Sequence, residues 1–149
     1  MKIILLFLLL LLTGSEALSQ NCNKPNSLIS VTKRKSGKTE YVIFNLKKPV
    51  TSTPALSTVS PPFTKDGSGN KLTIKGCRYK QVKFENIDWM CTITNQLNAY
   101  TYYINQVKKT GQFEGVITYI IGCSCNTKSV VSYSYDDRDI MKFVVRFKG

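Results

Sequence analysis

Hydrophobic residues in this sequence alternate with polar ones at a period of two. In the C-terminal stretch, Met141, Phe143, Val145 and Phe147 fall on one face of an extended chain. Successive side chains of a strand point to opposite faces, so this period predicts β-strands. No window of ten or more residues has an apolar stripe at the helical period. The alternation therefore favours an all-β chain.

Several segments have this alternation or a related run of β-branched and aromatic residues. The predicted strands cover residues 40–46, 72–79, 89–94, 99–107, 113–121, 129–135 and 140–147. Residues around Gly111 and residues 136–139 separate neighbouring strands and predict hairpin turns. We expect a small antiparallel sandwich or barrel of about seven strands, held by disulfides.

The N-terminal residues have the composition of a secretory signal peptide. Lys2 precedes ten apolar residues, 3–12. As a helix these would rise roughly 15 Å, about half the thickness of a hydrocarbon core. Small residues at Ala17 and Ser19 predict cleavage before Gln20, with cleavage after Ala17 as the nearest alternative. We expect residues 1–19 to be removed and residues 20–149 to form one secreted, extracellular domain.

The strand pattern is interrupted at residues 47–70, which contain four of the five prolines and eight serines and threonines. No alternating run occurs there, and such a length is unusual for a loop inside a compact domain. We expect either an excursion without fixed structure or a loop that presents Phe63 to a partner. Its Ser, Thr and Pro content permits O-glycosylation.

Five cysteines follow the predicted cleavage site: Cys22, Cys77, Cys91, Cys123 and Cys125. Disulfides are the default in a secreted chain, so all five are disulfide candidates. The sequence does not decide among the possible pairings. A bond between Cys123 and Cys125 would close an awkwardly small ring, so at least one of them should reach a distant cysteine such as Cys77 or Cys91.

The number of cysteines is odd, which leaves one without an intramolecular partner. This thiol either joins two copies in a disulfide-linked homodimer or stays buried as a small apolar residue. Cys22, next to the new N-terminus, is the natural anchor for that chain end. A C-x-C pair without histidine is poor spacing for zinc, so no metal site is expected.

The sequence contains no histidine, which excludes several kinds of chemistry. Ser-His-Asp triads, Cys-His dyads and His-ligated metals are all absent. Asp136, Asp137 and Asp139 surround Arg138, and they predict a turn whose carboxylates point into water. Because no other carboxylates are paired, we expect no enzyme activity and no cofactor.

The chain is strongly basic, with 21 Lys and Arg against 9 Asp and Glu and a net charge of +12. Removal of residues 1–19 takes away Lys2 and Glu16 together, so the mature chain keeps this charge. Such an excess favours an anionic partner. Lysine greatly outnumbers arginine, which favours diffuse attraction over bidentate readout and argues against sequence-specific nucleic-acid binding.

Three groups of basic residues are candidates for anion binding. One lies before the Ser36–Gly37 turn, one on and around the predicted strand 72–79, and one on the last strand. The predicted anion-binding residues are Lys33, Arg34, Lys35, Lys71, Lys75, Arg78, Lys142, Arg146 and Lys148. Lysines that only coat strand edges and deter strand pairing are the alternative.

These features predict a secreted, basic, non-enzymatic binding protein. Its partner would be a glycosaminoglycan, a membrane surface or an acidic protein, and salt would weaken the binding through counterion release. The alternative function is a small-barrel carrier of an apolar ligand. Its cavity would be lined by aromatic residues: Trp89, Tyr100, Tyr102, Tyr103 and Tyr119.

Overall fold

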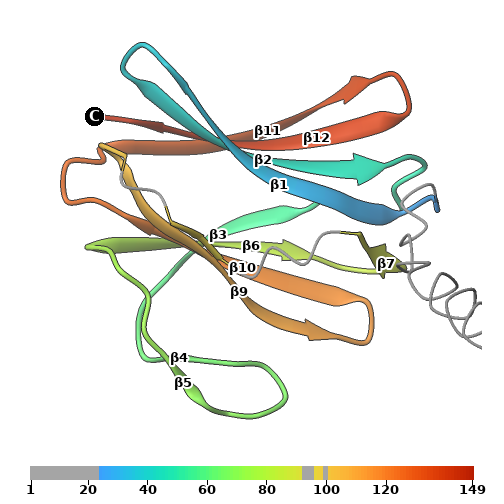
Figure 1. Cartoon of the computed structure of the whole chain (residues 1–149), viewed down its shortest axis with the longest axis horizontal. Coiled ribbons are helices and arrows are strands. Elements are labelled where there is room, and N and C mark those ends of the chain that lie inside the picture. The colour runs from blue at the N-terminus through green and yellow to red at the C-terminus, as the bar shows by residue number, and fades with distance from the viewer. Residues whose placement is uncertain (1–23, 92–95, 99–100) are drawn as a thin grey trace, which may run out of the picture.

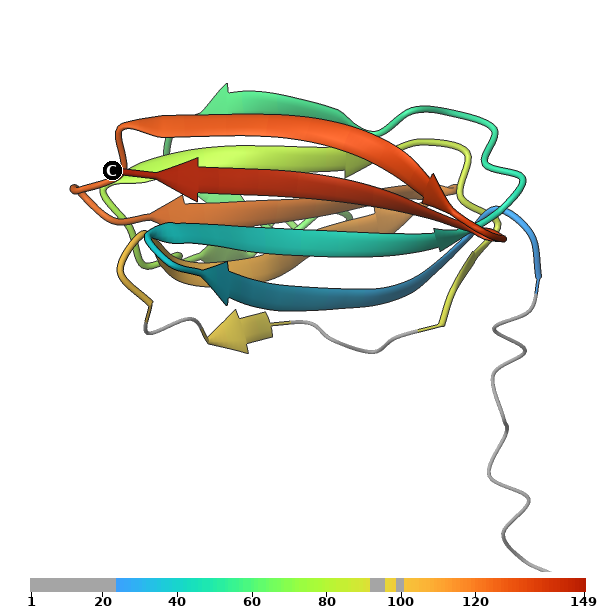
Figure 2. The same ribbon diagram turned by 90° about the horizontal axis from the view of Figure 1, so that it is seen from above.

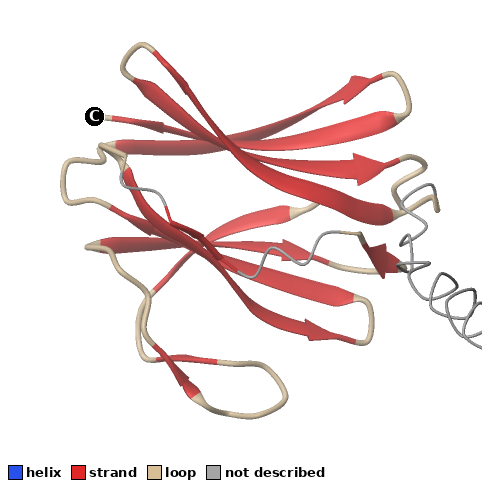
Figure 3. Cartoon of the chain, viewed as in Figure 1, coloured by secondary structure: helices blue, strands red, loops and turns tan. Residues whose placement is uncertain are grey.

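The computed structural model describes residues 24–91, 96–98 and 101–149, and these consist of strands and loops (Figure 3). The predicted all-β class is confirmed. The described residues form twelve strands rather than about seven. They include no helix that is long and apolar enough to cross a membrane. The predicted signal peptide and Cys22 lie outside the described residues.

Two five-stranded sheets face each other in two layers (Figures 1 and 2). Sheet A has the order β11 (Ser129–Asp137), β12 (Ile140–Lys148), β2 (Thr39–Lys47), β1 (Ser27–Ser36) and β7 (Trp89–Met90). Sheet B has the order β3 (Ala55–Val59), β6 (Arg78–Phe84), β10 (Val116–Cys123), β9 (Ile104–Phe113) and β8 (Gln96–Asn98). Neighbouring strands are antiparallel, except that β1 and β7 are parallel.

The hydrophobic core lies between the two sheets because the period-two alternation turns one face of each strand inward. On β2, Val42, Phe44 and Leu46 are fully buried, and their neighbours in the sequence are only half-buried. The ring of Phe44 lies 5.1 Å from that of Phe84 and 5.3 Å from that of Tyr119, both in sheet B. Burying one such side chain contributes about 1.5–3 kcal/mol.

The Pro-rich segment 47–70 contains two short strands, β3 and β4 (Phe63–Thr64). β3 pairs on one side only, as expected for a strand flanked by prolines. β4 forms a hairpin with β5 (Lys71–Leu72) that lies over the outer face of sheet B (Figure 1). Phe63 is buried there, with its ring 4.9 Å from that of Tyr79, so it is not presented to a partner.

The predicted turn around Gly111 is wrong, because the β9–β10 turn lies at Glu114 and Gly115. Both of these residues have positive φ, at 46° and 76°, which suits a two-residue hairpin turn. Gly111 lies inside β9, where a Cβ atom would come within 1.6 Å of the Asp66 carboxylate. The glycine thus permits close approach of the β4–β5 hairpin.

Candidate anion-binding site

The predicted basic run on β1 is divided between the two faces of the strand. Lys33 and Lys35 alternate with Arg34, and they lie on the same side as the buried Val31. Partial burial lowers the pKa of Lys33, against the opposing effect of the Glu40 carboxylate. Arg34 lies on the outer face of sheet A and is exposed. The three cations therefore do not face one anion from the same side.

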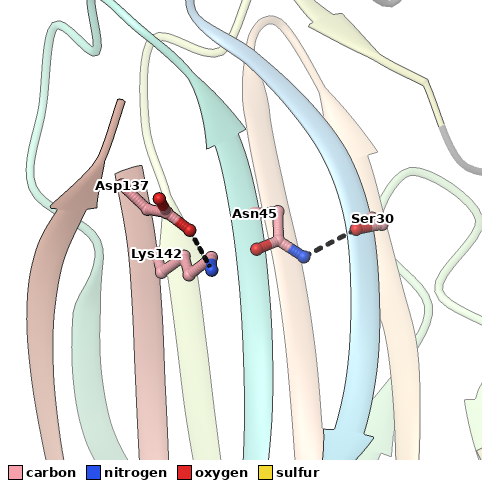
Figure 4. A network of polar contacts seen from close by, with 4 residues as sticks. All are labelled: Ser30, Asn45, Asp137 and Lys142. Carbon is pink, nitrogen blue, oxygen red and sulfur yellow. Dashed lines mark hydrogen bonds and ion pairs between the residues drawn. The ribbon is translucent and has the colours of Figure 1, made fainter. Parts of the chain in front are cut away.

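The third predicted group lies on one face of its strand, the outer face of β12: Lys142, Arg146 and Lys148. Lys142 is already engaged, because its Nζ donates a 2.5 Å hydrogen bond to Asp137 (Figure 4). Next to it on this face, the Asn45 amide donates to the Ser30 hydroxyl at 2.7 Å. Two of the three predicted cations thus remain without a carboxylate partner in the described part of the chain.

The second predicted group is not on one strand, so the shared face expected for Lys71 and Lys75 is wrong. Residues 73–77 are not a strand, and β6 begins only at Arg78. The cause is a backbone crossing, in which a Cβ atom on Gly76 would lie 2.9 Å from the Cα atom of Gly122. Contact with β10 at this point ends the strand pairing, and it separates Lys71 and Lys75 from Arg78.

The structure instead gathers basic residues at one end of the strands, which we term the basic end. Its members are Arg34, Lys35, Lys38, Arg78, Lys80, Lys128, Arg146 and Lys148. They come from the β1–β2 turn, the end of β12, the start of β6 and the β10–β11 connection, which all lie on the left in Figures 1 and 2. Lys38 and Lys80 belong to the basic groups of the sequence but were not among the predicted anion-binding residues, and Lys128 belongs to none of these groups.

Glu40 is the one acidic residue at the basic end within the described ranges. It is 1% exposed, and its carboxylate accepts hydrogen bonds from the backbone N–H groups of Tyr102, Tyr103 and Ile104, at 2.8, 2.9 and 3.2 Å. These bonds tie β2 to the segment that enters β9 in the opposite sheet. Glu40 is therefore occupied inside the fold and offers little exposed negative charge at this end.

The opposite end of the strands, which we term the ion-paired end, holds most of the acidic residues: Glu85, Asp88, Glu114, Asp136, Asp137 and Asp139. These turn carboxylates are exposed, as predicted, and each of them also pairs with a lysine. Asp139 pairs with Lys47, Asp136 with Lys48 at 2.7 Å and Asp137 with Lys142.

These pairs form because β11 and β12 bring the turn beside the end of β2, where lysines stand. Hydrogen bonds from Lys142 and Lys47 lower the pKa values of Asp137 and Asp139 respectively. A further pair joins Lys83 and Glu85 at 2.6 Å. The lysines of this end are thus neutralised, whereas the basic end keeps its charge.

A cleft of about 490 Å³ opens at the basic end between the two sheets. Arg78 and Lys80 line one wall, and Lys128 lines the other. Arg78 Nη1 donates to the Thr127 carbonyl at 3.2 Å, and Lys80 Nζ donates to Thr58 Oγ1 at 2.6 Å. No carboxylate is among the described residues that line this cleft. The arrangement is suited to holding an anion between fixed cations.

The cleft lies where the start of β6 in sheet B faces the start of β11 in sheet A. Arg78 and Lys80 occupy the core-facing side of β6, in line with the buried Val82 and Phe84. Across the gap, the core-facing positions of β11 change from the half-buried Val130 to exposed serines. Because these positions of β11 are polar and exposed, this side of the gap is accessible to water, and cations can remain hydrated there.

One of the predicted long-range disulfides forms, between Cys77, which lines this cleft, and Cys125, which lies three residues before Lys128. Cys123 is a buried thiol, and burial raises its pKa to about 11 against the opposing effect of the nearby Lys80 and Arg78. Cys91 is half-buried, and its backbone N–H donates to the Leu28 carbonyl at 2.7 Å.

The aromatic residues predicted to line a carrier cavity differ in how deeply they are buried. Tyr119 is buried among core rings, Tyr103 is also buried, and Tyr102 is 62% exposed. Tyr100 and the Trp89 side chain lie outside the described part of the chain. On β11, Tyr133 and Tyr135 stack with ring centres 6.3 Å apart on the exposed outer face of sheet A.

No group of acidic or cysteine side chains that could hold a metal ion occurs within residues 24–91, 96–98 and 101–149. No family model, curated protein or solved structure matches this chain. The site therefore has to be judged on its own geometry and charge.

Proposed function

We propose that the chain is a secreted, non-enzymatic binding protein that recognises an anionic extracellular partner through its basic end. The observation that carries this proposal is the segregation of charge along the strands. Four of the six acidic residues of the ion-paired end form ion pairs with lysines, whereas the basic end has eight cations and, among the described residues, only the buried Glu40 as an acidic residue. A concentrated positive field attracts and orients a polyanion more strongly than the same charge spread evenly.

Among anionic partners we favour a sulfated polysaccharide. The cations stand on turns and strand ends of both sheets, so an extended chain with repeated negative charges can contact several of them at once. Lysine and arginine without carboxylate partners release counterions from such a chain when they bind. A membrane surface or an acidic protein is the competing partner. The tyrosines do not favour the carrier function, because Tyr119 packs against other core side chains instead of lining a ligand cavity.

A pair of double variants with equal charge change tests this function on immobilised heparin. Lys35→Gln/Lys38→Gln alters the basic end, and Lys48→Gln/Lys83→Gln alters two lysines that already have carboxylate partners. We expect the first variant to elute at clearly lower salt than the second. The slope of log affinity against log salt should fall by roughly 0.7–0.9 for each contact removed.

Equal elution of the two variants would show that only net charge matters, and it would overturn the proposed site. Retention no stronger than that of a neutral protein would overturn the polyanion partner. Binding to vesicles with anionic headgroups is measured alongside binding to heparin. Binding to them with no binding to heparin would assign the basic end to a membrane surface instead.

A further inference from the structure

The cleft at the basic end has cations on two facing walls. Arg78 and Lys80 are fixed by hydrogen bonds to Thr127 and Thr58, whereas Lys35, near the end of β1, and Lys38, in the β1–β2 turn, are exposed. A guanidinium has five N–H donors and an ammonium three, so most donors of both groups remain available to a ligand. The disulfide holds the Lys128 side of the cleft against β6.

Three cations around one space fit a compact anion better than an extended one. Hydroxyl groups of Thr58 and Ser60 are also at the cleft, and they can donate to further oxygen atoms. A planar carboxylate presents two oxygens, but a sulfate or phosphate monoester presents three in a tetrahedral arrangement. Arginine donates bidentately to such groups, and these charge-assisted bonds are among the strongest hydrogen bonds in proteins.

We propose that the cleft binds a single sulfate or phosphate monoester group of an anionic ligand, held between Arg78, Lys80 and Lys128. A volume of about 490 Å³ lies in the range of small-molecule sites, so it also admits the sugar ring that carries the ester. Val59, Pro61 and Val130 supply apolar surface for that ring. The inference rests on the proposed function in that it names the chemical group of the partner that is recognised.

The probes are three monosaccharides: glucose 6-sulfate, glucose 6-phosphate and glucuronate. Binding is followed by NMR at the backbone amides of Thr127 and Lys128. We expect saturable one-to-one binding of at least one ester and none of the carboxylate at equal concentration. Comparing the affinities of the two esters shows whether the cleft prefers a sulfated sugar or a phosphorylated one.

The variant Lys80→Met/Lys128→Gln removes two cleft cations, and Lys35→Gln/Lys38→Gln is the control with the same charge change at the same end. Loss of two charge-assisted hydrogen bonds should weaken ester binding about tenfold or more in the cleft variant. The control should change it less than about twofold, because those lysines lie outside the cleft. If the double variant does not fold, Lys128→Gln alone, at an exposed side chain, repeats the test.

Equal losses in both variants, non-saturable shifts or equal binding of glucuronate would each overturn the ester site. Failure here is distinct from failure of the proposed function. Heparin retention that depends on Lys35 and Lys38, with no ester binding in the cleft, removes only this inference. Ester binding in the cleft with no heparin retention keeps this site and removes the polysaccharide.

Discussion

The two ends of the molecule are held together by different interactions. At the ion-paired end, lysines of β2 and β12 meet the aspartates of the β11–β12 turn on the exposed surface. At the basic end, like charges gather, and the structure uses the buried Glu40 and the Cys77–Cys125 disulfide instead. Exposed ion pairs contribute little to stability, whereas buried hydrogen-bonded carboxylates and disulfides contribute several kcal/mol.

This difference indicates how a fold can present unpaired cations without coming apart. Repulsion among the cations favours separation of the turns at the basic end. A covalent bond and a carboxylate inside the fold oppose this separation without neutralising the exposed charge. Stability and binding should therefore respond to different substitutions at each end.

The largest effect is expected for Glu40→Ala. The substitution leaves three N–H groups without an acceptor: those of Tyr103 and Ile104, which are buried, and that of Tyr102, which is partly buried. Loss of such a buried carboxylate should lower the free energy of unfolding by about 3–5 kcal/mol, measured by urea denaturation. Glu85→Ala, at an exposed ion pair, should cost at most about 1 kcal/mol. A similar loss in the two variants would contradict the contrast between the ends.

The next effect is expected for the double variant Cys77→Ser/Cys125→Ser. The disulfide closes a separation of 48 residues, and its loss should lower the free energy of unfolding by about 2–4 kcal/mol. If the disulfide also joins the walls of the cleft as proposed, ester binding should weaken more than heparin binding does. Full retention of ester affinity would show that the walls are held by other contacts.

A smaller effect is expected for Asp136→Asn/Asp137→Asn/Asp139→Asn, measured as the salt needed for heparin elution. The variant releases Lys47, Lys48 and Lys142 from their pairs and makes the second end basic. Affinity for heparin should rise several-fold, with little change in the thermal midpoint. Unchanged elution would mean that the charge difference between the ends does not govern binding.

The smallest effect is expected for Lys142→Gln. The hydrogen bond from Lys142 lowers the pKa of Asp137, so its removal should raise this pKa toward the ordinary value of an aspartate. Because the folded-state pKa is depressed, the stabilisation by this pair is present above the unfolded-state pKa and is lost as pH falls through the folded-state pKa. NMR titration of the carboxylate checks this, and Lys128→Gln should leave the titration unchanged.

Strands with clear alternation were predicted most accurately from the sequence, and several short or polar strands were missed. β2 and β12 alternate cleanly because one face of each is buried, and both were predicted within a residue or two. β1 was missed because its second half, from Thr32 on, is polar and mostly exposed. β3 and β4 were missed because proline and serine dominate a segment whose strands are short and lie away from the centre of the sheets.

The candidate site was predicted only in part, since its cations come from distant parts of the chain. Arg78 was among the predicted anion-binding residues, Lys80 belonged only to the same basic group of the sequence, and Lys128 was in none of the three groups. The signal that could have found Lys128 is the disulfide itself, because Arg78 follows Cys77 directly and Lys128 lies three residues after Cys125. Because the sequence does not decide how the five cysteines pair, it did not show that Lys128 lies near Arg78.

The charge segregation makes the folded chain an electric dipole aligned with its strands. Strands of nine or ten residues separate the two ends by roughly 30 Å. The electric field of a polyanion orients such a dipolar protein before contact, so the basic end is the part that meets the polyanion first. Its association rate at low ionic strength should therefore exceed that of a protein with the same net charge spread evenly, and the ion-paired end should face away from the polyanion.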